Sequence, residues 1–111
     1  MKIDHVLKSE EFKKVLEKGF RVKGKNLALY VLDTPGKRLS VGAILSKKNA
    51  RLAITRNYIK RVLYSFYREN SSLREKKVVA KLNKPFDAKG KGLGVLVRNE
   101  LVMLEEKIEK R

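Results

Sequence analysis

No acidic residue occurs in residues 34–68, although this segment is dense in positive charge. Its nine cations are more than half of the formal net charge of +16: Lys37, Arg38, Lys47, Lys48, Arg51, Arg56, Lys60, Arg61 and Arg68. Because an ionised side chain is buried only when it is paired, the fold must leave these cations in water or against a partner.

The second half of this segment has helical periodicity. At roughly 100° per residue, the apolar residues Ile59, Val62, Leu63 and Phe66 fall within about 60° of one another, which predicts a helix over residues 52–70. The polar side chains fan across its other side: Arg56, Asn57, Lys60, Arg61, Tyr64 and Arg68. A basic face without acids repels itself unless a polyanion covers it, so the helix is predicted to bind nucleic acid.

The composition excludes several other classes of function. With no Cys and one His, the chain lacks disulfides, thiolate metal sites and a His cluster for zinc, and no clustered carboxylates suit a metal-dependent nuclease. No apolar run approaches the roughly 18 residues of a membrane span, and the first residues do not resemble a signal peptide, so we expect a cytoplasmic protein with no membrane partner. The length of 111 residues fits one RNA-binding domain over residues 1–111, and the pI of about 10.3 favours a nucleic-acid partner.

The first half of the chain predicts one helix and two strands. Ser9–Lys18 has the apolar spacing of a short helix. Leu27–Asp33 is nearly all apolar, as expected of a central strand. A turn at residues 34–37 and a second strand at residues 38–46 follow, and the two strands are expected to pair as an antiparallel hairpin. Asn49 is the predicted cap of the basic helix.

The second half of the chain predicts a less regular series of secondary-structure elements. Residues 73–82 suit either a short helix or a strand, and the Pro and Gly content of residues 83–92 indicates a loop. Residues 93–98 predict a last strand and residues 100–110 a closing amphipathic helix. The whole series predicts an α+β fold, a two-layer sandwich of a small, mainly antiparallel sheet with about three helices.

The basic segment also carries a spaced motif, KKN-x-R-x-A-x-x-RN-x-x-KR. Its residues here are Lys47, Lys48, Asn49, Arg51, Ala53, Arg56, Asn57, Lys60 and Arg61. This pattern resembles the signature of the bacterial ribonuclease P protein component, and the likeness extends well over residues 7–67 and loosely beyond them.

The resemblance implies the protein subunit of an RNA enzyme. In that family the catalytic RNA and its magnesium ions remove the 5′ leader of precursor tRNA, while the protein contacts this RNA and holds the single-stranded leader in a cleft. The implied partners are ribonuclease P RNA and precursor tRNA, and the protein is expected to have no catalytic residue, no metal or cofactor of its own, and no activity alone. The implied fold includes a left-handed crossover through the signature helix.

The resemblance and the charge pattern together predict two sets of contacts. The set that faces the catalytic RNA is Lys48, Arg51, Arg56, Asn57, Lys60, Arg61, Tyr64 and Arg68. The set at the leader cleft is Phe12, Tyr30 and Lys47. Three departures from the family pattern are Tyr58 where Arg is usual, Tyr64 and Ser65 in place of a common Arg-Glu pair, and Leu16 where a second aromatic is frequent.

Two other functions are compatible with the size and charge. A ribosomal or other structural RNA-binding protein is one, although the spacing of the motif argues against it. A DNA-binding helix-turn-helix regulator, with the basic helix in the major groove, is the other. Predicted strands, rather than a paired helix and short turn, precede the basic helix, which argues against the second.

Overall fold

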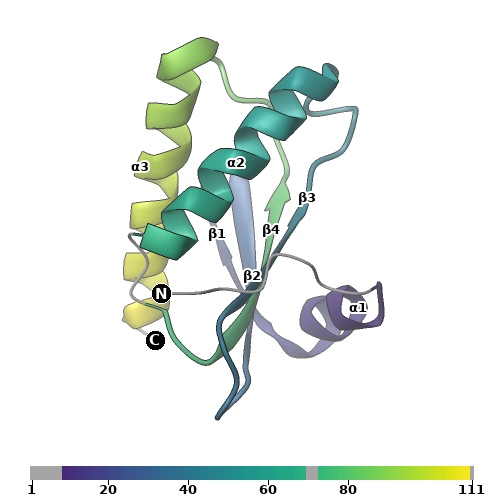
Figure 1. Ribbon diagram of the computed structural model, residues 1–111, viewed down its shortest axis with the longest axis vertical. Coiled ribbons are helices and arrows are strands. Elements are labelled where there is room, and N and C mark those ends of the chain that lie inside the picture. The colour runs from purple at the N-terminus through teal and green to yellow at the C-terminus, as the bar shows by residue number, and fades with distance from the viewer. Residues whose placement is uncertain (1–8, 70–72, 111) are drawn as a thin grey trace.

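The computed structural model describes residues 9–69 and 73–110, in which three helices surround one four-stranded sheet (Figure 1). In chain order the elements are α1 (Ser9–Lys18), β1 (Phe20–Lys23), β2 (Leu27–Asp33), β3 (Ser40–Ile44), α2 (Ala53–Glu69), β4 (Lys76–Leu82) and α3 (Gly90–Glu109). The predicted first helix and first strand are confirmed as α1 and β2, while β1 was not predicted. The basic helix is α2, and its predicted last residue, Asn70, lies outside the described residues.

The sheet has the order β1-β2-β4-β3, so β4 rather than β3 lies beside β2. β1 and β4 pair with β2 antiparallel, and β3 pairs with β4 in parallel. The predicted hairpin of β2 with β3 is therefore wrong. The turn forms, since the Lys37 N–H donates to the Thr34 carbonyl at 3.1 Å and Gly36 has a φ of +80°. However, β4 pairs along all of β2, and β3 lies at the edge of the sheet.

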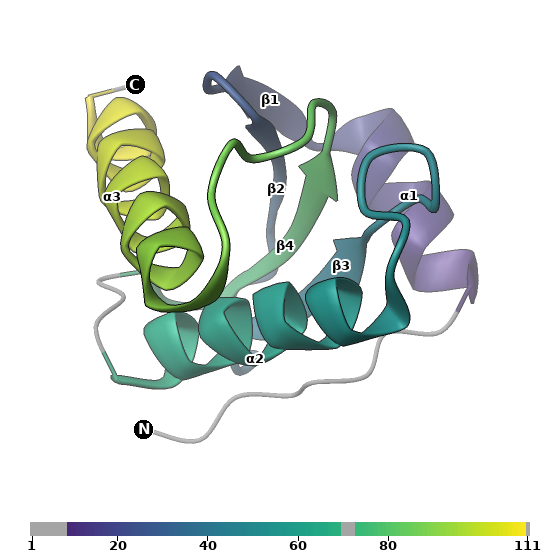
Figure 2. The same cartoon turned by 90° about the horizontal axis from the view of Figure 1, so that it is seen from above.

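β3, α2 and β4 form a parallel β-α-β unit. β3 and β4 both run upward in Figure 1, and Figure 2, seen from above, shows α2 on the same side of the sheet as α3. Followed from β3 through α2 to β4, the crossover is left-handed, which is the opposite of the usual hand. The expectation from the family resemblance is confirmed.

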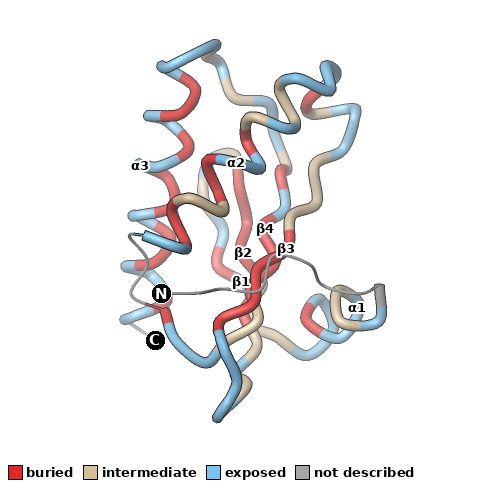
Figure 3. The backbone as a smooth tube through the Cα atoms, in the orientation of Figure 1, coloured by how far each residue is buried: buried red, intermediate tan, exposed pale blue. Residues whose placement is uncertain are grey.

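Helices cover both faces of the sheet, unequally. α2 and α3 cover one face, and burial concentrates where they meet the strands (Figure 3). The buried residues of α2 are Ile59, Val62, Leu63, Phe66 and Tyr67, which include the four predicted ones. α1 packs on the other face, where Val15 joins Val79. The predicted α+β class is confirmed, and α1 adds a partial third layer.

α3 takes in residues that were predicted as a separate strand. Residues 93–98 lie inside this helix, so the predicted strand is wrong, and the loop before it ends at Lys89. Buried side chains recur at helical spacing along the whole element: Leu93, Val97, Leu101, Leu104 and Ile108. The Val-Leu-Val run favours a strand locally, but this continuous apolar stripe against α2 and the sheet stabilises a helix.

Glu100 fastens α3 to the loop between β1 and β2. Its buried carboxylate accepts hydrogen bonds from the Asn26 N–H, at 3.1 and 3.0 Å to its two oxygens, and from the Leu27 N–H. The Asn26 side chain in turn donates from Nδ2 to the Pro85 carbonyl at 2.8 Å. One carboxylate thus satisfies two backbone donors at the start of a central strand, which water cannot easily reach.

This anchor predicts a large loss of stability for Glu100→Ala. Each backbone N–H left without an acceptor should cost about 1–3 kcal/mol of unfolding free energy, and Glu100→Gln, which keeps one oxygen, should cost less. The exposed Glu106 on the same helix provides the control, because its replacement by Ala should change the unfolding free energy by less than about 0.5 kcal/mol. Urea denaturation measures all three, and equal stability of the two Ala variants would contradict the anchor.

Candidate nucleic-acid interface

The residues predicted to face the catalytic RNA lie on and just before α2, and we call them the helix surface. The set is Lys48, Arg51, Arg56, Asn57, Lys60, Arg61, Tyr64 and Arg68. All are exposed except Arg56 and Tyr64, which are half-buried. Because the apolar stripe of α2 points into the core, the opposite side of the helix is held toward solvent.

No carboxylate neutralises the helix surface among the described residues. The two salt bridges recorded there join Lys76 to Asp33 and Lys77 to Glu11, the latter at 3.2 Å, and both lie away from α2. The cations of the helix surface therefore repel one another in the free protein. A polyanion that covers this face would relieve the repulsion.

Arg56 has a structural role as well as its charge. Its Nη1 donates to the carbonyls of Ala50 and Arg51, at 2.8 and 3.0 Å, so the side chain holds the loop that leads into α2. Asn49 lies in the same loop, and its Nδ2 donates to the Leu82 carbonyl at 3.0 Å. The prediction that Asn49 caps the helix is wrong, because α2 begins only at Ala53. The asparagine instead ties the loop to the end of β4.

Two tyrosines of α2 differ in their access to a partner. Tyr67 is fully buried, and burial, together with the nearby Glu105 carboxylate, raises the pKa of its hydroxyl. Burial also raises the pKa of Tyr64, which is only half-buried. Both hydroxyls stay protonated near neutral pH, and of these two rings only that of Tyr64 is partly exposed at the helix surface.

The structure brings Phe12 and Tyr30 together on the other face of the sheet. Both are half-buried and pack against a small cluster formed by Val15 of α1 and Val79 of β4. The expectation that their two elements lie side by side is confirmed by the contact of α1 with β2. Neither ring is wholly enclosed, so each leaves part of an aromatic surface at the rim of this face.

Three cations that sequence reasoning missed lie around Tyr30. Arg21 is directly opposite Tyr30 in the pairing of β1 with β2, and Lys23 and Lys81 flank Ala28 two residues away. Paired residues share a face of a sheet, so these exposed cations and Tyr30 lie on one side. We call Phe12, Tyr30, Arg21, Lys23 and Lys81 the sheet surface. The alternation of charged and other residues along β1 was the available signal, but only the strand order places Arg21, Lys23 and Lys81 together.

Lys47, the third residue predicted at the leader cleft, comes from neither α1 nor β2. It is exposed in the loop between β3 and α2. Figure 1 shows this loop above α1, and Figure 2 shows it over α1 when the molecule is seen from above. Its role at the leader cleft stays a prediction.

Other kinds of site find little support in the described part of the chain. No three His, Cys, Asp or Glu side chains gather there as a metal site would require. No helix within residues 9–69 and 73–110 is both long enough and apolar enough to cross a bilayer. A strand, β3, rather than a helix precedes α2, so the helix-turn-helix arrangement does not fit.

The motif, the basic α2 and the left-handed crossover agree with a comparison against known families. The family model for ribonuclease P matches residues 1–101. This chain belongs to the ribonuclease P protein family. The predicted resemblance is confirmed.

Several relatives carry the name ribonuclease P protein component. Those from Halalkalibacterium halodurans and Bacillus pumilus are 39% identical over 72 residues and 36% identical over 78 residues. These alignments cover 63% and 68% of this chain, and 60% and 65% of the relatives. One from a Pseudanabaena species is 41% identical over 61 residues, which are 54% of this chain and 53% of the relative. The matched part thus spans between half and two thirds of the length of these relatives.

Solved structures of the ribonuclease P family share the fold. The Staphylococcus aureus RNase P protein matches with a TM-score of 0.80 and 24% identity, over 98% of this chain and 97% of that one. The protein from Thermotoga maritima matches with a TM-score of 0.71 and 16% identity, over 93% and 96% of the two chains. The architecture is therefore the same at low sequence identity.

Proposed function

We propose that this chain is the protein subunit of ribonuclease P. It binds the catalytic RNA through the helix surface and the 5′ leader of precursor tRNA through the sheet surface, and so assists removal of the leader. The observation that carries the proposal is the helix surface. Apart from the half-buried Arg56, its cations are exposed, and no described carboxylate pairs with them. They lie in the signature segment of a chain that belongs to the ribonuclease P protein family.

The side chains of the helix surface suit phosphate contacts. The planar guanidinium of Arg61 or Arg68 grips a phosphate with two parallel N–H donors, whereas Lys60 acts as a point charge. Asn57 adds a hydrogen-bond donor between these charges, and Tyr64 adds part of an aromatic ring. The protein contributes binding and position, and the RNA with its magnesium ions contributes the hydrolysis.

The sheet surface suits a single strand rather than a duplex. A half-buried Tyr30 offers a ring on which an unpaired base stacks, and Phe12 lies in the same cluster. Arg21, opposite Tyr30, and the flanking Lys23 and Lys81 are placed to hold the neighbouring phosphates. Contact of this kind is tolerant of sequence because every base has a π-face.

The proposal predicts a change in salt dependence when the helix surface loses charge. Replacing Lys60, Arg61 and Arg68 together by Ala should make the log–log slope of affinity against salt shallower by roughly 2 to 3 units, at about 0.7–0.9 per phosphate contact. Arg56 is left intact because its loss would also release the loop before α2. The affinity for a bacterial ribonuclease P RNA is measured over a series of salt concentrations.

The control for this experiment removes the same charge elsewhere. Lys37, Arg38 and Lys110 are exposed and lie outside both surfaces, so their joint replacement by Ala should leave most of the slope intact. An equal change of slope in the two triple variants would mean that net charge alone, rather than the helix surface, governs binding.

The sheet surface predicts an effect that depends on the leader. In the assembled holoenzyme, Tyr30→Ala should weaken binding of precursor tRNA by roughly five- to more than a hundredfold, the equivalent of one stacked base, and leave mature tRNA nearly unchanged. Tyr30→Phe keeps the ring and should bind like the wild type. Phe12→Ala should act in the same direction as Tyr30→Ala.

Thermal melts separate this role from a purely structural one. If Phe12 served only the core, its truncation would lower the free energy of unfolding by about 3–5 kcal/mol. The variant that remains folded would then bind precursor tRNA and mature tRNA with the same affinities as the wild type. Folded Tyr30→Ala protein that binds precursor and mature tRNA as the wild type does would refute the leader assignment.

A further inference from the structure

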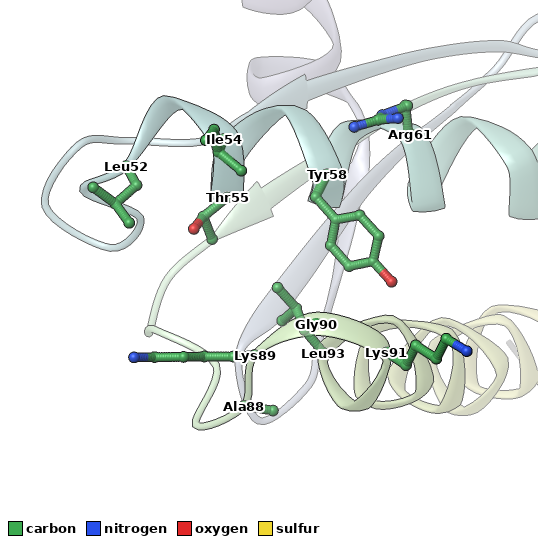
Figure 4. Close-up of a pocket in the computed structure, with 10 residues that line it drawn as sticks. All are labelled: Leu52, Ile54, Thr55, Tyr58, Arg61, Ala88, Lys89, Gly90, Lys91 and Leu93. Carbon is green, nitrogen blue, oxygen red and sulfur yellow. The ribbon is translucent and has the colours of Figure 1, made fainter.

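A cavity of about 510 Å³ lies where the first turns of α2 and α3 approach each other. Figure 4 shows its walls, with Ile54, Thr55 and Tyr58 on α2 facing Gly90, Lys91 and Leu93 on α3. Leu52, Arg61, Ala88 and Lys89 complete the lining. The volume is in the range of small-ligand sites, and the cavity lies beside the helix surface.

The cavity depends on a residue that distinguishes this chain from the family pattern. Tyr58 stands in the motif where Arg is usual, and its ring reaches across to α3. A Cβ on Gly94 would come within 2.6 Å of the Tyr58 hydroxyl oxygen, so the glycine allows the ring to lie against α3. Tyr58 is half-buried, which leaves part of the ring as a wall of the cavity.

The other lining groups divide into apolar walls and a basic rim. Leu52 and Ile54 keep 68% and 79% of their surface exposed, which is high for large apolar side chains. Arg61, Lys89 and Lys91 are exposed at the edges, and none of the ten lining residues is acidic. Apolar and aromatic walls beneath cations complement a flat base attached to a phosphate.

We propose that this cavity binds one unpaired nucleotide of RNA. The base lies against Tyr58 between Ile54 and Leu93, and Lys89 or Lys91 holds the adjoining phosphate. This inference rests on the proposed function, because the nucleotide comes either from the catalytic RNA or from precursor tRNA.

The test compares Tyr58→Phe with Tyr58→Leu in the full chain. Phe keeps the ring and should bind within about twofold of the wild type, whereas Leu keeps an apolar group beside Gly94 without a π-face and should bind roughly 5- to 150-fold more weakly. One arm measures affinity for a bacterial ribonuclease P RNA, and the other measures affinity of the assembled holoenzyme for precursor tRNA. The arm that shows the loss identifies the source of the nucleotide.

A second variant does not depend on the packing of Tyr58. Lys89 and Lys91 are exposed, so their joint replacement by Ala should preserve the fold. In the binding experiment where Tyr58→Leu weakens affinity, this double variant should make the log–log slope of affinity against salt shallower by about 0.7–0.9, as expected for one lost phosphate contact. Thermal melts accompany both tests.

The outcomes separate this inference from the function on which it rests. If the wild-type chain binds neither RNA, the proposed function and the cavity site both fail. If the wild type binds but Tyr58→Leu binds equally well in both arms, or the double lysine variant keeps the full slope, the cavity site alone is wrong.

Discussion

The packing of α2 against the sheet determines where this protein carries its charge. Ile59, Leu63 and Phe66 can be buried on only one side of the helix, so the cations between them must face outward. The left-handed crossover from β3 to β4 then lays α2 across the same face as α3. The exposure of the basic side of α2 is therefore a consequence of the core, and no described carboxylate compensates its charge.

The spacing of apolar residues along the chain predicted those helices and strands that show a clear pattern within their own sequence. α1, β2 and α2 were predicted within about a residue where the structure describes them. The sheet order was not predictable in the same way, because β4 displaces β3 from β2 through pairings between residues about fifty positions apart. Residues 93–98 were misassigned because their Val-rich run favours a strand locally, whereas the buried stripe that continues to Ile108 sets the helical period.

The candidate site also contains residues that one segment predicts and residues that only the strand order brings together. The helix surface follows from one amphipathic segment, and its residues were predicted by number. Arg21, Lys23 and Lys81 come from two strands far apart in the sequence, and only the pairing of β2 with both β1 and β4 places them around Tyr30. The two surfaces lie on opposite faces of the sheet, so the two proposed RNA contacts would not compete for the same part of the protein.

Reconstitution with a bacterial ribonuclease P RNA at low magnesium tests the central claim most directly. Cleavage of precursor tRNA is followed with the RNA alone, with the RNA-free chain alone, and with both together. Because the cations of α2 and the sheet surface would lower the repulsion between the catalytic RNA and its substrate, the mixture should release the 5′ leader much faster than the RNA alone, and the chain alone should release none. Cleavage by the RNA-free chain, or a mixture no faster than the RNA alone, would contradict this account.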